Sequence, residues 1–304
     1  MRLGLADSLR TILDSLDDSF AVQPDAVRRL LAAVEAAPLK PRIFGAYVDL
    51  VTALFDDRTA EAQALLDELL SEDPAAPASF RVVTMDDGEL GRGQTERYRR
   101  LVNDDVQFVL EPAPATERAA ATAVLQAAFD LLADGAPTVG GEIRGFFREV
   151  VLVTNAEGRG IGGASSFALW GAVLLNTDCL GDRLTAAVAL AHEAAHAHLF
   201  GLALGGRLVG NSDDDRYSSP LRSDPRPMEG IAHAVYVLGR MIFTLRALIE
   251  SGALTPAETA QARDQLRVDL AAYHDGLATL LAHAQFTPAG AGALEHLRRY
   301  MDAS

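Results

Sequence analysis

The sequence has 304 residues, of which 49% are hydrophobic and 23% charged, and its formal net charge is −15 at pH 7. This composition is ordinary for a folded protein with one large core or two smaller ones. The negative charge disfavours binding to nucleic acid and to an anionic membrane surface, because both require basic surfaces. We therefore expect neither a nucleic acid nor a membrane as a partner.

The single cysteine, Cys179, excludes an intrachain disulfide and favours a reducing, cytoplasmic location. We expect its thiol to be buried among apolar side chains rather than to act as a nucleophile. The chain has no run of about 18 uncharged apolar residues, the length that a membrane-spanning helix needs. Acidic residues begin at Asp7, which is too early for a signal peptide, so we expect none.

The first 75 residues predict helices throughout, because their apolar side chains recur at helical spacing. Leu9, Ile12 and Leu16 form one such stripe. The proline- and alanine-rich segment 71–78 is typical of a loop or linker. We therefore expect a helical N-terminal region over residues 1–75 and a second domain over residues 76–304.

Beyond this linker, short runs of β-branched and aromatic residues predict strands. These runs cover residues 80–85, 106–110, 146–154, 165–170 and 171–176. The glycine-rich segment 158–163 has no following helix and no Lys-Ser/Thr, so a phosphate-binding loop is disfavoured. We expect this segment to be a hairpin connection instead.

Further helices are predicted from apolar periodicity in the second half of the chain and in one long alanine-rich segment before it. They cover about residues 115–134, 182–203, 227–251, 256–284 and 290–302. The predicted fold class is therefore α+β and mostly α-helical, with helical N-terminal and C-terminal regions. We expect the small sheet to pack beside the helix at 182–203.

The helix at 182–203 contains the motif H-E-x-x-H, formed by His192, Glu193 and His196. Residues four apart lie on the same face of a helix, so both imidazoles can reach one metal ion. Glu193 lies beside them. This spacing is typical of metalloenzymes and is the strongest chemical signal in the chain.

A second pair of polar side chains, Glu229 and His233, follows one helix and one loop later. Pro225 and Pro227 precede them, and proline is typical of the first turn of a helix. Glu229 and His233 are therefore expected on one face of the first turns of the helix at 227–251. A metal could bind the two motif histidines and one member of this pair.

In these blocks the chain resembles the H-E-x-x-H proteins of bacterial peptide natural-product gene clusters, described as 2-oxoglutarate-dependent peptide β-hydroxylases. The resemblance covers roughly residues 145–250 and is carried by the motif helix at 192–196, by the block Arg222–Tyr236 and by the segment Gly163–Asn176. Where the family commonly has His-Gly-x-Tyr, this chain has His-Ala-Val-Tyr at residues 233–236.

The resemblance implies a cytoplasmic enzyme that uses Fe(II), 2-oxoglutarate and O₂ to hydroxylate a side-chain β-carbon of a ribosomally made precursor peptide. An iron oxygenase needs three protein ligands on one face, which leaves positions open for the cosubstrate and O₂. The position of His233 in the family block favours it as the third ligand beside His192 and His196. Glu229 is the alternative third ligand, and Glu193 would orient ligands or water.

The distal carboxylate of 2-oxoglutarate also needs a cation, and the planar fork of an arginine suits a carboxylate. Arg226, and after it Arg222, are the residues that we expect to bind this cosubstrate. Both lie in the loop just before Glu229 and His233.

Two other functions use the same residues. In a zinc metallopeptidase, Glu193 would be the general base that activates a zinc-bound water and Glu229 would be the third ligand. In a non-catalytic helical peptide-binding protein, the motif would be degenerate. Metal content, and whether a peptide is cleaved or gains oxygen, would discriminate between these functions.

Overall fold

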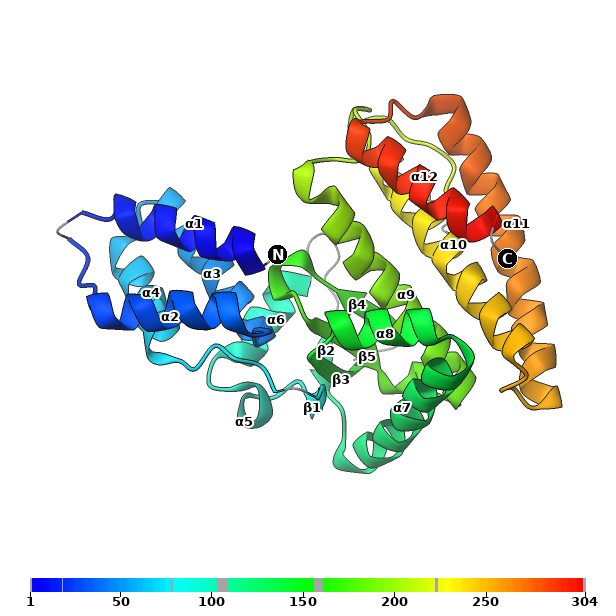
Figure 1. The fold of residues 1–304 in the computed structure, drawn as a ribbon, viewed down its shortest axis with the longest axis horizontal. Coiled ribbons are helices and arrows are strands. Elements are labelled where there is room, and N and C mark those ends of the chain that lie inside the picture. Colours follow the sequence, from blue (N-terminus) through cyan, green and yellow to red (C-terminus); the bar gives the residue numbers. More distant parts are fainter. Residues whose placement is uncertain are drawn as a thin grey trace. The chain divides into compact units, whose positions relative to one another are not determined.

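The computed structural model describes residues 2–17, 19–77, 79–102, 109–155, 161–221 and 224–302. Over these residues the protein is mostly α-helical with a small mixed sheet, which confirms the predicted α+β class (Figure 1). The chain forms two compact units. The first unit contains Met1–Ala113 and Phe147–Asn176, and the second contains Pro114–Phe146 and Thr177–Ser304.

The first unit begins with helices that have one common core. These are α1 (Arg2–Ser15), α2 (Pro24–Ala36), α3 (Pro41–Phe55) and α4 (Thr59–Ser71). Proline opens α2 and α3, where the missing N–H costs no helical hydrogen bond. Leu9, Leu50 and Leu66 lie in the shared core with at most 1% of their surface exposed. The helical prediction for residues 1–75 is thus confirmed over the described residues.

The same unit contains the sheet. Its strands are β1 (Arg81–Thr84), β2 (Leu110–Pro112), β3 (Glu149–Asn155), β4 (Gly163–Ser165) and β5 (Ala172–Asn176). β3 pairs in parallel with β1 and β5, while β2 is antiparallel to β3 and β4 is antiparallel to β5. β3 and β5 are central and almost fully buried, which explains their continuous apolar runs.

Two predictions in this region are wrong. Residues 165–170 do not form one strand, because after Ser165 the chain enters a 3₁₀ turn, η2 (Phe167–Leu169), in which the Ser166 hydroxyl accepts the backbone N–H of Ala168. The glycine-rich segment is not a hairpin connection either, because β4 pairs with β5 and β5 lies between β3 and β4. Residues 158–160 of that segment lie outside the described residues, as do residues 106–108 of the predicted strand at 106–110.

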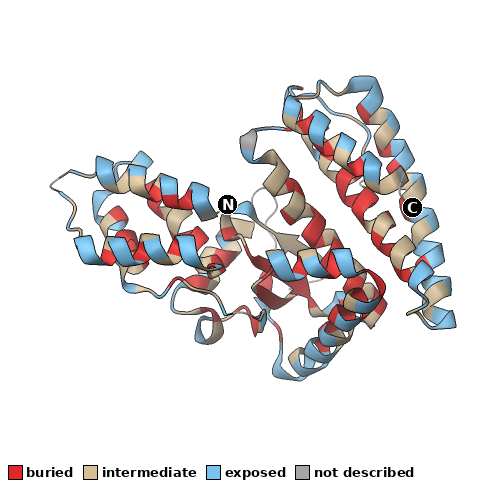
Figure 2. Ribbon diagram, in the orientation of Figure 1, coloured by how far each residue is buried: buried red, intermediate tan, exposed pale blue. Residues whose placement is uncertain are grey.

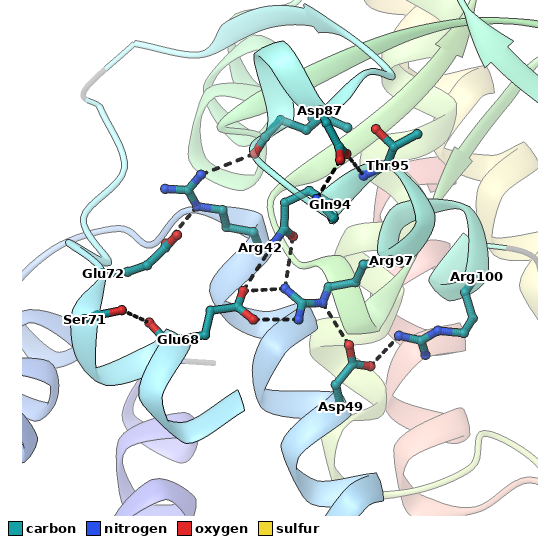
Figure 3. Close-up of polar contacts among 12 residues, drawn as sticks. Arg42, Asp49, Glu68, Ser71, Glu72, Asp87, Gln94, Thr95, Arg97 and Arg100 are labelled. Carbon is teal, nitrogen blue, oxygen red and sulfur yellow. Dashed lines mark hydrogen bonds and ion pairs between the residues drawn. The ribbon is translucent and has the colours of Figure 1, made fainter. Parts of the chain in front are cut away.

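Two short helices that the sequence did not predict, α5 (Asp87–Leu90) and α6 (Gln94–Val102), follow β1. Arg97 of α6 lies between Asp49 of α3 and Glu68 of α4, with nitrogen–oxygen distances of 2.8 and 2.6 Å (Figure 3). Its side chain is only 10% exposed, so this ion pair network is largely withdrawn from water. The network ties α6 to the N-terminal helices within the first unit.

The second unit is helical over its described residues. Its helices are α7 (Ala115–Gly135), α8 (Pro137–Phe146), α9 (Arg183–Leu202), α10 (Met228–Ser251), α11 (Pro256–His283) and α12 (Pro288–Asp302). α10 lies at the centre and packs against α7, α9, α11 and α12 (Figures 1 and 2). Glycine residues allow α10 to approach α11 and α12 closely. A Cβ at Gly239 would lie 2.3 Å from Leu297 of α12, and one at Gly276 would lie 2.6 Å from Val235.

Within the described part of the chain, α10 is also the helix that is long and apolar enough to cross a membrane by length and composition. Of its most apolar window, 67% is buried inside the protein. Burial of this extent is typical of a core helix. The motif helix α9 belongs to this second unit and the sheet to the first. Cys179, in the 3₁₀ turn η3 (Thr177–Cys179), is exposed, so the prediction of a buried thiol is wrong.

Candidate metal centre

The motif helix α9 is fixed at its start by side-chain contacts. The Asp182 carboxylate accepts the backbone N–H of Thr185 at 2.9 Å, which caps the first turn. Arg183 donates to Glu258 of α11 at 2.7 and 2.9 Å. From there the helix runs through small buried side chains, of which Ala187, Ala191 and Ala194 are examples. These alanines let neighbouring helices approach closely and leave the larger histidines at defined positions.

The two motif histidines face each other across one turn of α9. The Nε2 atoms of His192 and His196 are 3.3 Å apart, and their ring centroids are 5.0 Å apart. Bonds from imidazole nitrogen to zinc are about 2.0–2.1 Å long, so two nitrogens at this separation can bind one ion between them. The predicted pairing of His192 and His196 is therefore present in the structure.

Burial keeps both rings uncharged at neutral pH. It lowers the pKa of His192, and together with the neighbouring His192 and His233 it lowers the pKa of His196 to about 3. A metal ion binds the neutral form of imidazole, and at neutral pH these two side chains are already in that form. The electrostatic environment thus matches the requirement of a ligand pair.

His233 and Glu229 lie on the first turns of α10, as predicted. The His233 ring is 6.3 Å from the His196 ring, centroid to centroid, and Phe200 lies 6.3 Å from each of them. Glu229 Oε1 is 3.7 Å from His233 Nε2. The structure therefore places this pair beside the two motif histidines.

The Glu229 carboxylate already has backbone partners. Its two oxygens accept the N–H groups of Leu208 and Val209, each at 3.2 Å. Burial raises the pKa of Glu229, but His233 and these two N–H groups outweigh burial and hold the pKa below its usual value. Glu229 is thus an ionised group that ties the loop before α10 to the helix and lies against His233.

A complete three-donor set is not gathered in the part of the chain that the structure describes, where no three His, Cys, Asp or Glu side chains are close enough to hold one ion. His192 and His196 form the assembled part of the site. His233 and Glu229 are the side chains beside this pair that could supply a third donor.

The motif glutamate and the loop arginines are placed differently. Glu193 is buried in the helical core with 4% of its surface exposed. Arg226 exchanges two backbone hydrogen bonds of 2.9 Å with Tyr217, and its Nε lies 3.0 Å from Asp224 Oδ2. Among the described residues, no hydrogen bond joins the Arg226 guanidinium to the histidines. Arg222 lies outside the described residues.

A neighbour of His192 was missed by the sequence analysis. The Sδ atom of Met241 on α10 is 3.3 Å from Nδ1 of His192, on the opposite edge of the ring from His196. Met241 follows His233 by eight residues on the same helix, and no sequence pattern marks it. The contact depends on how α9 and α10 pack.

A second polar cluster in the same unit was also missed. His198 Nδ1 is hydrogen-bonded to the Tyr236 hydroxyl at 3.0 Å, and its ring is 5.1 Å from that of His296. Burial, then Arg240, then His296 lower the pKa of His198 to about 4. Arg240 is 2% exposed, pairs with Glu142 and lies 4.4 Å from the ring of Tyr300. His198 therefore makes its contacts away from the motif pair.

Comparison with known proteins adds no identification. No model of a known protein family matches the chain, and no curated protein matches it significantly. The geometry around His192, His196 and His233 therefore carries the functional interpretation together with the sequence motifs. What that geometry defines is a candidate metal centre between two helices of the second unit.

Proposed function

We propose that the protein is an Fe(II)- and 2-oxoglutarate-dependent hydroxylase that acts on a side-chain β-carbon of a ribosomally made precursor peptide. One observation carries the proposal, namely the pair of uncharged imidazoles of His192 and His196 whose Nε2 atoms are 3.3 Å apart, with His233 beside them. The resemblance of residues 145–250 to the peptide β-hydroxylases adds the cosubstrate and the reaction.

The donor set suits a mononuclear iron. Imidazole binds Fe(II) as well as zinc, and an oxygenase keeps open positions for the cosubstrate and O₂. His233 is the preferred third ligand, because both oxygens of Glu229 already accept backbone N–H groups. Glu229 would then lie beside the ligand His233. A carboxylate in such a position fixes the orientation of a ligand ring and raises the basicity of that ring.

Bound iron would supply the activation of O₂, and 2-oxoglutarate would be consumed as the cosubstrate. The chain itself has to hold the cosubstrate, and Arg226 is the proposed partner of its distal carboxylate, with Arg222 in support. The present partner of Arg226, Asp224, is 56% exposed. An ion pair of this exposure contributes little to stability, so a cosubstrate carboxylate can replace it at small cost.

The precursor peptide needs a surface of its own, because metal and cosubstrate occupy the motif region. The N-terminal helices α1–α4 are the proposed peptide-binding element. A ribosomally made peptide is available in the cytoplasm, which fits the predicted location. The net charge of −15 permits a neutral or cationic peptide.

The zinc metallopeptidase is the alternative that uses the same histidines. It would require Glu193 to activate a water on the metal, with Glu229 as third ligand. The burial of Glu193, at 4% exposed, favours a supporting role over contact with solvent water. Glu193→Gln should therefore keep measurable hydroxylation, whereas the same change should nearly abolish a peptidase.

The proposal is tested with the full chain and the candidate peptide encoded beside its gene. Anaerobically purified protein is given Fe(II), 2-oxoglutarate and ¹⁸O₂, and the peptide mass and succinate are measured. One labelled oxygen in an intact peptide is the expected result. A peptide that is cleaved under zinc without O₂ would establish the peptidase instead, and a protein that binds no metal would establish the non-catalytic alternative.

A further inference from the structure

The ring of His192 is held between two partners on opposite edges. Its Nε2 faces the Nε2 of His196 at 3.3 Å, and its Nδ1 faces the thioether sulfur of Met241 at 3.3 Å. These two contacts use both ring nitrogens. In the part of the chain that the structure describes, Met241 is the hydrogen-bonding partner of His192 Nδ1.

The chemistry of the sulfur decides where the ring hydrogen lies. A neutral imidazole carries one hydrogen, either on Nδ1 or on Nε2, and its position is deduced from the partners of the two nitrogens. A thioether has no hydrogen to donate and can act only as a weak acceptor. The contact with Met241 is therefore a hydrogen bond only when Nδ1 carries the hydrogen. The lone pair of His192 then lies on Nε2, the nitrogen that faces His196.

The second contact agrees with this arrangement. Two nitrogen lone pairs facing each other at 3.3 Å would repel, so one of the two Nε2 atoms must carry a hydrogen. Since His192 carries its hydrogen on Nδ1, the donor is His196, whose Nε2–H points at the His192 lone pair. In the metal-free protein the hydrogen between the two rings therefore belongs to His196.

We infer that Met241 is a positioning residue for His192: its sulfur holds the hydrogen on Nδ1 and so aims the Nε2 lone pair at the metal site. The tautomer follows from the contacts alone, and its use for a metal rests on the proposed function. In most metal sites this position is taken by a carboxylate, a carbonyl or water. A sulfur acceptor is weaker, so it orients the ring while raising its basicity less.

The location of Met241 suits this role. It lies on α10, the helix that also carries His233, and α9 packs directly against α10. The ring of His192 therefore has one partner on its own helix and one on the helix that supplies the third donor. A shift of α10 relative to α9 would disturb the His192 tautomer and the approach of His233 together.

The tautomer can be measured without any metal. Long-range ¹⁵N–¹H correlation spectra of the metal-free full chain distinguish Nδ1–H from Nε2–H for each of the seven histidines, and the His192 signals are assigned by their loss in His192→Gln. Wild type should show His192 as Nδ1–H. Met241→Leu nearly conserves volume but removes the acceptor, so the Nε2–H tautomer should appear. Met241→Gln supplies an amide oxygen and should keep Nδ1–H.

Metal affinity is the second measurement, with cobalt(II) as the probe and its visible absorption as the signal. Loss of an outer partner of a ligand histidine lowers metal affinity about 10–100-fold, and we expect the lower end for Met241→Leu because sulfur is a weak acceptor. Met241→Gln should bind cobalt at least as well as Met241→Leu does. Met85→Leu, the same exchange at a fully buried site of the first unit, is the matched control and should change neither measurement.

The outcomes separate this inference from the proposed function. Wild-type His192 found as Nε2–H, or a Met241→Leu protein that equals wild type in either measurement, would overturn the positioning role. A wild type with the Nδ1–H tautomer that binds cobalt but adds no oxygen to peptide would overturn the proposed reaction and leave the role of Met241 intact.

Discussion

At the scale of single residues, the site depends on which side chain completes the pair of His192 and His196. Two neighbouring side chains, Glu229 and His233, could do so, and they make different contacts in the structure. Glu229 accepts two backbone N–H groups, whereas His233 contacts Glu229 and the ring of Phe200. Redirecting Glu229 would break two backbone hydrogen bonds, whereas turning His233 would break none, so His233 has more freedom to turn towards a bound ion.

The third ligand can be identified by iron stoichiometry in anaerobically purified variants. His192→Ala and His196→Ala should abolish binding. Loss of a residue that hydrogen-bonds a metal ligand lowers metal affinity about 10–100-fold, and His233→Ala should lower the affinity for iron by more than this. Glu229→Gln retains one oxygen for the backbone N–H groups, and its affinity for iron should fall by no more than this range. Full stoichiometry in His233→Ala together with loss in Glu229→Gln would assign the carboxylate as ligand.

The role of Arg226 is tested through the cosubstrate. Loss of a hydrogen bond to a charged group costs about 1.5–3 kcal/mol, so Arg226→Ala should raise the apparent constant for 2-oxoglutarate about tenfold to hundredfold. Arg226→Lys should restore only part of this, because an ammonium lacks the planar fork. Arg207→Ala, a nearby loop arginine paired with Asp213, is the control. An unchanged constant in Arg226→Ala would exclude this assignment.

At the scale of elements, periodicity predicted the long helices well and the contacts between them poorly. The H-E-x-x-H spacing fixes His192 and His196 on one helical face, since both lie on one element. Met241, Arg240 and Glu142 could not be found in this way, because their contacts depend on how α8, α9 and α10 pack. The turn at Phe167–Leu169 was mistaken for a strand because its apolar run is too short to distinguish the two.

The packing of α8, α9, α10 and α12 around His198 predicts a pH dependence of stability in the metal-free protein. His198 has a pKa of about 4 when folded, because burial, Arg240 and His296 disfavour its charged form, against 6.5 as the ordinary value. Below pH 6.5 the unfolded chain therefore takes up a proton that the folded chain does not. The free energy of unfolding should fall as the pH is lowered from about 6.5 to about 4.

Urea unfolding at a series of pH values measures this dependence. His198→Gln removes the titrating group while keeping a polar side chain opposite Tyr236, and its free energy of unfolding should fall less steeply over the same interval. His274→Gln, on α11, is the control and should follow wild type. Equal slopes for His198→Gln and wild type would show that the ring does not contribute.

At the scale of the whole molecule, the division into units differs from the boundary expected at residue 75. The first unit joins the N-terminal helices to the sheet through contacts that cross that boundary. Arg97 pairs with Asp49 and Glu68, and the Ala76 backbone N–H donates to the Pro38 carbonyl at 2.8 Å. Trp170 packs against the core of α1–α4 although it lies about a hundred residues later in the chain. Sequence patterns could not show these connections, because each joins residues far apart in the chain.

These contacts predict that a fragment of residues 76–304 does not keep the first unit folded. Removal of the N-terminal helices would expose the apolar side of the remaining elements and leave Arg97, at 10% exposed, without both carboxylate partners. Breaking a buried ion pair by removing one partner costs about 3–5 kcal/mol, a large part of the stability of a typical domain. Amide hydrogen exchange should therefore show loss of protection in β1, β3 and β5 of the fragment.

Within the full chain, Arg97→Met should lower the stability of the same strands, whereas Arg58→Met, at an exposed pair with Glu61, should not. Strands as well protected in the fragment as in the full chain would instead establish residues 1–75 as a separable domain.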